Sequence, residues 1–378
     1  MLHRIGDIYA ERSERGAADM ELLSVTMNGG VMQRSEIEGK DNSSEDKSNY
    51  KVVRKGDMVY NSMRMWQGAN GVSSYDGIVS PAYTVLTAKV SICNEYFAAL
   101  FKNYKLINEF RKNSQGMTSD TWNLKYPQIE TIKVYLPEVA EQEKVASMLV
   151  TLDKRIAAQA TLVEQLKKYK RGVMSVLLSS KDNPYYSSET WEEVSLCDVA
   201  SGFEYGMNAA ATNYDGSHKY IRITDIDDSS HLYIQNELVS PEGQAEEKYR
   251  VQENDILFAR TGASVGKSYC YQQSDGNLYY AGFLIRINVN SGVDCGYVFQ
   301  NTLTEAYKRW VVLESARSGQ PGINAEQYKQ YRFLLPPIET QKKISLLASN
   351  LDDLICKGKI LLSQLEQVKT SLLQQLFI

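Results

Sequence analysis

The stretch GASVGKS (262–268) nearly spells a phosphate-binding loop, in which backbone amides and a lysine hold the phosphates of a nucleotide. That motif has four residues between its first glycine and the Gly-Lys-Ser, whereas this stretch has three. It also lies between DILFAR (255–260) and SYCYQQ (268–273), which both have the composition of strands, although a phosphate-binding loop must open a helix. We therefore predict a glycine-rich hairpin here and no nucleotide site.

The sequence lacks the residue patterns that catalytic sites and metal sites need. DNPYY (182–186) resembles the Asn-Pro-Pro-Tyr of amino-methyltransferases but has one proline fewer, and no glycine-rich strand–loop–helix for S-adenosylmethionine precedes it. The three histidines, His3, His218 and His231, and the five scattered cysteines without a C-x-x-C form no metal-ligand pattern. No carboxylate cluster or Ser/His/Asp arrangement stands out. The sequence predicts no catalytic residue and no metal site.

Three groups of polar residues instead have the chemistry of nucleic-acid contacts. Lys51, Arg54 and Lys55 are suited to phosphate oxygens. In NSMRMWQGANG (61–71), the arginine is suited to guanine, and the glutamine and asparagine are suited to adenine. The predicted hairpin adds side chains for backbone or base contact. The resulting DNA-binding candidates are Lys51, Arg54, Lys55, Arg64, Gln67, Asn70, Arg260, Thr261, Ser264 and Lys267.

Each of these candidates has an alternative as an ordinary solvated loop residue. Trp66 is expected to anchor its loop within the domain, and Asp57 and Asp255, which lie in matching turns, are expected to cap those turns. The formal net charge of −4 gives no global indication of nucleic acid. DNA meets one face of a protein and not its average charge, so a local basic surface stays compatible with this composition.

Length and composition indicate a cytosolic protein of several domains. At 378 residues, of which 43% are hydrophobic, the chain is long enough for two or more cores. It has no run of 18 apolar residues that would span a membrane, and its N-terminus lacks the apolar core of a signal peptide. The odd number of scattered cysteines favours a reducing compartment.

One segment of the chain occurs twice, 199 residues apart. LPEVAEQEKVASMLVTLDKRI (136–156) and LPPIETQKKISLLASNLDDLI (335–355) share Leu-Pro, a glutamine five residues after that proline, and a Leu-Asp before an isoleucine. Apolar residues then recur in steps of four and three, which is the heptad pattern of paired helices. The repetition predicts two equivalent long helices.

The two helices are expected to have about 33–38 residues each, or roughly 50–55 Å at 1.5 Å per residue. Each copy interrupts the heptad pattern at the same two places, first Gln159 and Lys170, then Gly358 and Lys369. A narrow apolar stripe needs a partner, so we predict that the helices pair with each other. The predicted seam of the pair comprises Val145, Leu149, Leu152, Ile156, Val163, Leu166, Ile344, Leu351, Ile355, Leu362, Leu365 and Leu372.

The segments before the two helices also correspond to each other. KGDMVYNS (55–62) aligns with ENDILFAR (253–260), and both regions alternate β-branched and aromatic residues with polar ones, which is typical of short strands. The predicted fold class is α+β, with two β-rich domains and two long helices that pair as a coiled coil in an internal pseudo-two-fold repeat. The predicted segments are 1–136 and 181–335 for the β-rich domains, and 137–180 and 336–378 for the helical spacers.

This organisation resembles the specificity subunit of type I restriction-modification systems. The resemblance covers essentially the whole chain and rests on the two helical repeats and on the stretches GDMVY (56–60) and NDILFARTG (254–262). In that family, each globular region is a target recognition domain that reads one half of a split DNA sequence. The resemblance implies that the helices pack antiparallel as a spacer, which gives a direct repeat approximate two-fold symmetry.

The resemblance also implies the partners and the division of chemistry. This chain would bind double-stranded DNA without catalysing a reaction, and it would dock two methyltransferase subunits and, where present, two restriction (motor nuclease) subunits. S-adenosylmethionine, ATP and magnesium would belong to those subunits, whose complex acts as an adenine-N6 DNA methyltransferase and an ATP-dependent endonuclease. The heptads alone leave one alternative, a coiled-coil scaffold without sequence-specific DNA binding.

Overall fold

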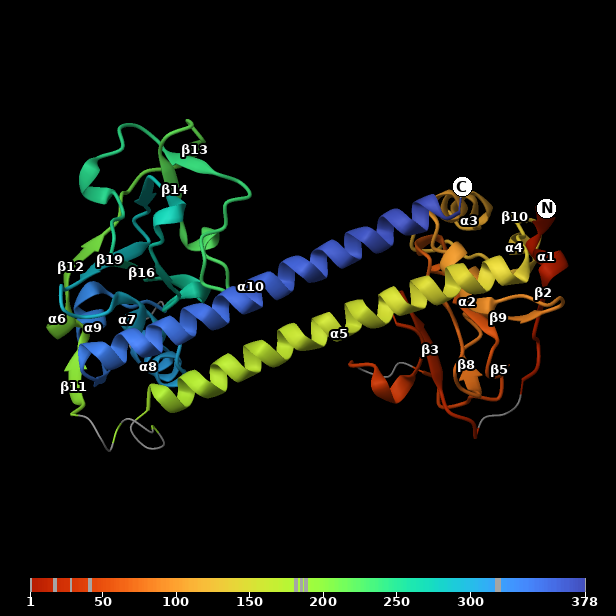
Figure 1. Ribbon diagram of the computed structural model, residues 1–378. Coiled ribbons are helices and arrows are strands. Elements are labelled where there is room, and N and C mark those ends of the chain that lie inside the picture. The colour runs from red at the N-terminus through yellow and green to blue at the C-terminus, as the bar shows by residue number, and fades with distance from the viewer. Residues whose placement is uncertain are drawn as a thin grey trace. The chain divides into compact units, whose positions relative to one another are not determined.

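The computed structural model describes the chain as two compact units. The described residues are 2–15, 19–27, 29–39, 43–179, 183, 186, 190–316 and 321–377. Unit 1 comprises residues 1–161 and 359–378, and unit 2 comprises residues 162–358. The division falls inside two long helices, α5 (Val139–Leu177) and α10 (Ile338–Gln375), so each unit contains part of both helices (Figure 1).

The β-rich part of unit 1 surrounds a four-stranded antiparallel sheet. Its strands are β1 (Leu2–Arg4), β2 (Tyr9–Glu11), β3 (Leu23–Thr26), β4 (Gly30–Gln33), β5 (Lys51–Val53), β6 (Met58–Asn61), β7 (Asn70–Val72), β8 (Gly77–Val79), β9 (Tyr83–Ala88) and β10 (Lys133–Tyr135). Its helices are α1 (Ile5–Ile8), α2 (Asn94–Leu100), α3 (Tyr104–Asn113) and α4 (Tyr126–Ile129), with the 3₁₀ helices η1 (Arg34–Glu36) and η2 (Met65–Gln67). The sheet order is β2–β9–β6–β7, and β3–β4 and β5–β8 form small sheets. β1 pairs with β10, which joins the start of the unit to the segment before α5.

Unit 2 repeats this plan with different small sheets. Its strands are β11 (Glu192–Ser195), β12 (Ala200–Tyr205), β13 (Ala211–Asn213), β14 (Lys219–Ile221), β15 (Val239–Pro241), β16 (Asp255–Ala259), β17 (Ser268–Cys270), β18 (Leu278–Tyr280), β19 (Leu284–Val289) and β20 (Arg332–Leu335). Its helices are α6 (Leu196–Val199), α7 (Cys295–Asn301), α8 (Glu305–Ser315) and α9 (Ala325–Lys329), with η3 (Ile223–Asp225), η4 (Glu247–Tyr249), η5 (Gly262–Ser264) and η6 (Gln273–Asp275). The order β12–β19–β16–β17 and the pair β11–β20 match unit 1, whereas the small sheets are β13–β15 and the parallel β14–β18.

The central strands are buried on both faces, which explains their nearly continuous apolar sequences. In β16, Ile256 and Phe258 pack into one core, whereas Leu257 and Ala259 pack into another. Successive side chains of a strand point to opposite faces, so this division follows from the period of two. The core that receives Ile256 also contains Met174 of α5, which ties the helix to the sheet.

The repeated glutamine fastens each long helix to its β-rich region. In unit 1, Gln142 is 1% exposed, and its side chain donates to the carbonyl of Pro137 and accepts the amide of Cys93, both at 2.9 Å. This side chain satisfies two backbone groups that burial would otherwise leave without partners. The need for both contacts explains the fixed spacing of five residues between the proline and the glutamine.

Unit 2 contains the same fastening 199 residues later. Gln341 is 2% exposed, donates to the carbonyl of Pro336 at 2.7 Å and accepts the amide of Asp294 at 2.9 Å. Cys93 and Asp294 both immediately precede a helix, α2 in unit 1 and α7 in unit 2. The Leu-Pro segments that are repeated in the sequence therefore perform one structural task twice.

Within each unit, the parts of α5 and α10 run in opposite directions. In unit 2, Lys170 of α5 pairs with Asp352 of α10 at 2.6 Å, and the later Leu178 shares a core with the earlier Ile344. In unit 1, Lys369 of α10 forms an ion pair with Asp153 of α5 at 2.5 Å. The antiparallel pair of the predicted α+β fold is thus confirmed.

The two ion pairs are the same pair with the helices exchanged. Lys170 and Lys369 are equivalent positions of the repeat, and so are Asp153 and Asp352, because 369 − 170 and 352 − 153 both equal 199. This exchange is what an approximate two-fold relation between the helices requires. It also explains why the heptad pattern is interrupted by a lysine at the same place in each copy.

The predicted seam residues are all at least partly covered. Leu351 is 6% exposed, whereas its equivalent Leu152 is half-buried. The two copies therefore share their register but not the depth of burial. The buried members are Leu149, Val163, Ile344, Leu351, Ile355 and Leu365, and the half-buried members are Val145, Leu152, Ile156, Leu166, Leu362 and Leu372.

The predicted segment boundaries follow element types and not the compact units. β10 ends at Tyr135 and α5 begins at Val139, while β20 ends at Leu335 and α10 begins at Ile338. The boundary between residues 180 and 181 lies outside the described residues, as does most of the DNPYY stretch. The compact units divide the chain within the helices because each helix packs against both β-rich regions in turn.

Candidate nucleic-acid interface

Two hairpin loops carry most of the predicted DNA-binding residues and occupy equivalent places in the two units. Hairpin loop 1 (residues 62–69) joins β6 to β7, and hairpin loop 2 (residues 260–267) joins β16 to β17. Each loop contains one 3₁₀ turn, η2 or η5, and then enters a strand. GASVGKS therefore forms a glycine-rich hairpin, as predicted, and not the strand-to-helix turn of a phosphate-binding loop.

The first residue of each loop makes the same backbone contact. In unit 1, the amide of Leu124 donates to the carbonyl of Ser62 at 2.8 Å. In unit 2, the amide of Ile323 donates to the carbonyl of Arg260 at 2.9 Å. Leu124 lies just before α4, and Ile323 lies just before α9. The same stretch of the repeat thus supports both loops from behind.

An aromatic cluster holds hairpin loop 1. The indole Nε1 of Trp66 donates to the carbonyl of Met63 at 3.0 Å, and the ring of Trp122 meets that of Trp66 edge-on with centroids 5.2 Å apart. The guanidinium carbon of Arg111 lies 5.7 Å from the centroid of the Trp66 ring. Trp66 therefore anchors its loop, as expected, and leaves Arg64 exposed to solvent.

Two of the predicted DNA-binding residues are buried, which contradicts their assignment. Asn70 is 0% exposed, and its Nδ2 donates to the carbonyl of Gly68 at 3.1 Å. Lys51 is 8% exposed, and its Nζ donates to the carboxylate of Glu11 at 3.0 Å and to the carbonyl of Tyr83 at 2.8 Å. Both residues belong to strands, and burial keeps the polar atoms of their side chains inside unit 1, so neither presents them to DNA.

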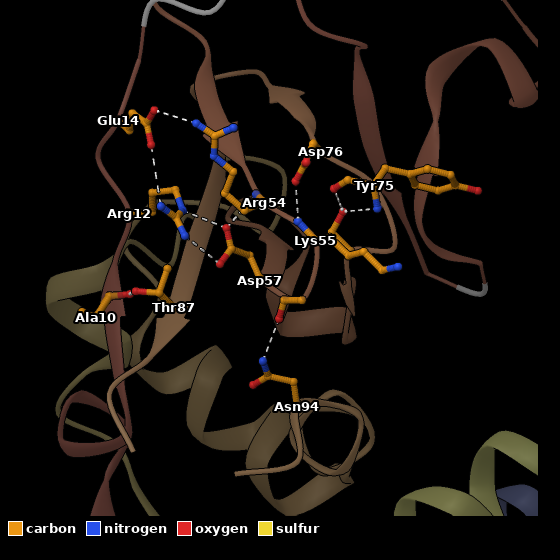
Figure 2. A network of polar contacts seen from close by, with 12 residues as sticks. Ala10, Arg12, Glu14, Arg54, Lys55, Asp57, Tyr75, Asp76, Thr87 and Asn94 are labelled. Carbon is orange, nitrogen blue, oxygen red and sulfur yellow. Dashed lines mark hydrogen bonds and ion pairs between the residues drawn. The ribbon is translucent and has the colours of Figure 1, made fainter. Parts of the chain in front are cut away.

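Asp57 closes the turn that leads into β6 (Figure 2). Its carboxylate accepts the amide of Arg54 at 2.8 Å and the Nε of Arg12 at 2.8 Å, and this second hydrogen bond raises the pKa of Arg12. The side chain of Arg54 pairs with Glu14 at 3.0 Å. Lys55 is exposed, and its Nζ has no polar partner within the described part of the chain. Asp57 is thus a cap, as expected, and Lys55 is the free cation beside it.

Asp255 closes the matching turn of unit 2 in the same way. Its carboxylate accepts the amide of Gln252 at 2.7 Å and the Nδ2 of Asn288 at 2.8 Å. Burial raises the pKa of this carboxyl group above its usual value, and the hydrogen bond from Asn288 opposes that shift. The aspartates that align in the two halves of the sequence are structural, and no substrate-facing carboxylate results from them.

The charges of hairpin loop 2 are distributed unequally. The Nζ of Lys267 pairs with the carboxylate of Asp228, which neutralises the lysine. Burial lowers the pKa of the neighbouring His231, so its ring carries no charge near neutral pH. Arg260 has no carboxylate partner among the residues that the structure describes. Of the two predicted cations of this loop, only the arginine is therefore available to an anion or a base.

Three residues that sequence reasoning missed complete the two loop surfaces. The guanidinium carbon of Arg260 lies 4.8 Å from the ring centroid of Tyr205, and loop 1 is packed by Arg111 and Trp122. These partners lie at least 42 residues from the loops (111 − 69), so no local spacing reveals them. The other predicted candidates, Gln67, Thr261 and Ser264, are half-buried.

A second row of apolar residues lies on the solvent side of the long helices. We call it the outer stripe, and its members are 37–60% exposed although they recur at multiples of seven residues. Residues seven apart lie on one face of a helix that pairs with others, so the outer stripe is a second, uncovered seam. Three of the four members on α5 have an equivalent member on α10, 199 residues later in the sequence. The outer stripe comprises Met148, Leu162, Tyr169 and Val176 on α5, and Leu347, Leu354, Leu361 and Val368 on α10.

Neither a membrane span nor a metal site is found in the described ranges of the chain. No helix there is long and apolar enough to cross a membrane. No group of three or more histidine, cysteine, aspartate or glutamate side chains is placed there to hold a metal ion. The surfaces that remain for function are the two hairpin loops and the outer stripe.

Comparison with known sequences identifies the class of protein that has this repeated architecture. The sequence profile of the type I restriction modification DNA specificity domain matches residues 18–168 and 188–367, once in each half. The chain therefore belongs to this family, as the resemblance predicted. This match does not favour the alternative of a coiled-coil scaffold.

Individual relatives are distant in sequence. The chain is 23% identical over 267 residues to the StySPI type I restriction enzyme specificity subunit of Salmonella potsdam, and the match covers 67% of this chain and 57% of that protein. It is 24% identical over 349 residues to the MjaVIII specificity subunit of Methanocaldococcus jannaschii, covering 86% and 79%. The crystal structure of the type I S subunit from M. genitalium has a TM-score of 0.62 at 14% identity and covers 100% of this chain and 96% of that one, so the two share a fold.

Proposed function

We propose that this chain is the DNA-recognition subunit of a type I restriction-modification complex, and that each unit reads one half of a bipartite DNA target. The observation that carries the proposal is the equivalent placement of hairpin loops 1 and 2. Each loop presents one arginine, Arg64 or Arg260, that has no carboxylate partner among the described residues. Arginine is the residue that most often reads guanine in the major groove, and two equivalent readers suit a target with two specified halves.

In this proposal the chain recognises DNA and catalyses nothing. Neither hairpin loop contains a carboxylate, and the aligned aspartates Asp57 and Asp255, which lie outside the loops, are occupied by backbone amides. The chemistry would come from two methyltransferase subunits that use S-adenosylmethionine. Restriction subunits that use ATP and magnesium would add cleavage where they are present.

We place the docking of the methyltransferase subunits on the outer stripe. Exposed leucines at heptad spacing are costly in water and are normally covered by another helix. Of the outer stripe, unit 2 carries Leu347, Leu354 and Tyr169 among others, and unit 1 carries Met148, Leu361 and Val368. Because the stripe is repeated by the internal symmetry, it would hold two copies of one helical partner.

The docking proposal is tested by counting subunits in the assembled complex. The double variant Tyr169→Asp with Leu354→Asp is expected to lose one methyltransferase subunit and to keep the other, because charges on an apolar seam oppose helix packing. Native mass spectrometry of the co-expressed complex measures this. The matched control is Gln364→Asp, an exposed position of α10 outside the outer stripe. Loss of both subunits, or of neither, would show that docking does not follow the repeated stripe.

The recognition proposal is tested by a methylation map of the host genome with and without this chain. We expect one bipartite motif to lose its adenine methylation when the gene is deleted and to regain it when the gene is restored. A map that does not change, or a lost motif with a single uninterrupted half, would contradict the two-reader function. The same map supplies the two half-sites that the experiments below require.

A further inference from the structure

We infer that Arg260, stacked on Tyr205, reads a guanine in the half-site of unit 2 through its two terminal nitrogens. This inference rests on the proposed function and adds to it the residue, the base and the edge of the guanidinium that are used. It also adds Tyr205 as a positioning residue. The argument starts from how the other arginines of this region are occupied.

The other arginines of the β-rich part of unit 2 that lie in or beside its strands are engaged with carboxylates. These pairs are Arg222–Asp225 at 2.8 Å, Arg250–Glu247 at 2.9 Å, Arg286–Glu204 at 2.5 Å and Arg332–Glu193 at 3.6 Å. Arg260 has no such partner within the described residues. A guanidinium that is already paired offers fewer donors to DNA, so among these described arginines in or beside the strands Arg260 is the one that is available.

The surroundings of Arg260 hold its guanidinium over the ring of Tyr205. The guanidinium carbon lies 4.8 Å from the ring centroid of Tyr205, and the hydroxyl of that tyrosine accepts the amide of Ala325 at the start of α9 at 3.3 Å. The amide of Arg260 donates to the carbonyl of Phe283 at 3.1 Å, and its carbonyl accepts the amide of Ile323. Three separate segments thus hold the residue and its stacking partner, which is the preorganisation that specific recognition needs.

The burial of individual atoms decides which edge of the guanidinium is offered. Nε of Arg260 is buried and has no hydrogen-bond partner. The terminal nitrogens have no partner among the described residues either, yet they are not buried, so they meet the solvent. The edge that includes Nε is therefore closed, and only the fork of the two terminal nitrogens can receive a ligand. That fork places two parallel donors at the end of a rigid side chain.

A fork of two parallel donors selects guanine among the bases. Guanine presents two acceptors, O6 and N7, on its major-groove edge, whereas adenine pairs one acceptor with a donor. The neighbouring Lys267, which would contact phosphate as a flexible point charge, is already paired with Asp228. Two residues that contact Arg260, Tyr205 through its ring and Phe283 through its carbonyl, have aromatic side chains that are 42% and 60% exposed. Exposed aromatic surface suits base edges better than a hydrated phosphate.

Among its described residues, unit 1 does not contain this device. The position equivalent to Arg260 is Ser62, which is 4% exposed and shares a hydrogen bond of 2.8 Å with the hydroxyl of Thr84. The arginine that stacks on an aromatic ring in unit 1 is Arg111, which comes from α3 and not from the hairpin loop. The inference is therefore specific to the half-site that unit 2 reads.

The test uses the full chain assembled with its methyltransferase subunits and duplexes that carry the mapped target. Each guanine of the unit 2 half-site is replaced in turn by 7-deazaguanine, which lacks the N7 acceptor but keeps its base pairing. For the unsubstituted protein, we expect one position to weaken binding by about tenfold, the loss expected for one hydrogen bond to a charged group. Arg260→Ala should weaken binding to the natural target by about 5- to 150-fold, as for loss of a bidentate arginine–guanine pair.

Coupling between the protein change and the base change decides the result. In Arg260→Ala and Arg260→Lys, the sensitive guanine should become insensitive to 7-deazaguanine, because the fork is gone. Tyr205→Leu should reduce the coupling between Arg260 and the sensitive guanine. Tyr205→Phe should leave that coupling intact, because phenylalanine keeps the ring. Arg332→Ala, which removes a surface arginine that is paired with Glu193, is the matched control and should change nothing.

Three outcomes overturn the inference while leaving the proposed function intact. The first is a uniform loss over all sequences with a salt slope reduced by about one, which identifies a phosphate contact. The second is sequence-specific binding that Arg260→Ala leaves unchanged. The third is a unit 2 half-site that contains no G·C pair. Absence of any sequence-specific binding by the unsubstituted complex would instead overturn the proposed function itself.

Discussion

The two units share the parts that touch the long helices and differ in the parts that face solvent. Gln142 and Gln341 make the same two backbone contacts, and the ion pairs of Lys170 and Lys369 exchange the helices. Away from the helices, the small sheets of unit 2 include a parallel pair that unit 1 does not have among its described residues. A common frame thus carries two unlike surfaces.

The hairpin loops show where the divergence begins. Both loops start on the same backbone contact, from Leu124 to Ser62 and from Ile323 to Arg260. At that point unit 1 has a buried serine and unit 2 has a stacked arginine. Backbone contacts do not depend on the side chain, so the frame stays fixed while each unit has its own side chains for recognition. Under the proposed function, this comparison explains how one duplicated fold would read two different half-sites.

Exchanging one reader is expected to have the largest effect. In a chimera that carries a foreign second recognition domain in place of residues 185–335, the Gln142 and Lys369 contacts of unit 1 are unchanged. We therefore expect one half of the methylated motif to be replaced completely and the other half to stay as it was. Methylation mapping of cells that express the chimera measures both halves at once.

The control for the chimera is the same exchange with the parental domain re-cloned across the same junctions. It should reproduce the original motif and thereby exclude an effect of the junctions. If both halves of the motif change together in the chimera, the two units do not read their half-sites independently. That result would contradict the proposal that each unit recognises its own half-site.

Charges placed in the helix seam should have the next largest effect, and an unequal one. Leu351→Asp puts a carboxylate at a position that is 6% exposed and should cost about 3–5 kcal/mol of unfolding free energy. The equivalent Leu152→Asp should cost less, about 1–3 kcal/mol, because Leu152 is half-buried. Denaturant titration of the isolated chain measures both.

Leu354→Asp serves as the control for the seam variants. Leu354 lies on the same helix but is 51% exposed, so its replacement should change the stability of the isolated chain by less than about 0.5 kcal/mol. Equal losses at positions 152 and 351 would show that the two copies of the seam are energetically interchangeable, against the difference in their burial.

Removing a fastening glutamine should destabilise one unit at a time. Gln142→Leu leaves the amide of Cys93 and the carbonyl of Pro137 buried without partners, at about 1–3 kcal/mol each. Gln341→Leu should do the same in unit 2. Hydrogen exchange should report faster opening of α2 in the first variant and of α7 in the second.

The control for the fastening variants is Gln165→Leu, an exposed glutamine on α5. It should leave exchange in both units unchanged. A result in which either fastening variant opens both units equally would show that the two units unfold as one body and are not separately fastened.

The sequence predicted the frame because the frame is local and periodic. The seam residues and the lysine interruptions recur at fixed steps, and Gln142 lies five residues after Pro137 as Gln341 does after Pro336. Helix packing and capping act over a few residues, so spacing along the chain records them. This is why the α+β plan and the pairing of the two long helices could be predicted from the residues, whereas the antiparallel direction of the pair was an implication of the family resemblance.

The recognition surface could be predicted only in part because its partners are far apart along the chain. Lys51 looked like a free cation, but Glu11, 40 residues earlier, neutralises it, and the carbonyl of Tyr83 accepts a second hydrogen bond. Arg260 stacks on Tyr205, which is 55 residues away (260 − 205) in another strand. Polarity in a sequence reveals which residues can contact DNA, but tertiary burial decides which of them do so.

The smallest expected difference lies in the two exchanged ion pairs. Double-mutant cycles with alanine should give a coupling of about 0.2–1 kcal/mol for Lys170 with Asp352, the range of exposed pairs. The coupling for Lys369 with Asp153 should be smaller, for two reasons. Lys369 is more exposed, at 27% against 15% for Lys170, so water screens its pair more strongly.

The second reason is a neighbouring cation that is found in unit 1. Burial, and then the charge of Lys369, lower the pKa of Lys102, while Asp153 acts in the opposite direction, so all three groups lie within electrostatic reach of one another. When Lys369 is replaced by alanine, Lys102 remains as a substitute partner for Asp153, and the measured coupling shrinks. Repeating the unit 1 cycle in a Lys102→Ala background should restore the larger coupling, and raising the salt concentration should weaken both pairs. Equal couplings in the original background, with no response to Lys102→Ala, would show that the exchange of helices makes the two ion pairs equivalent in energy as well as in position.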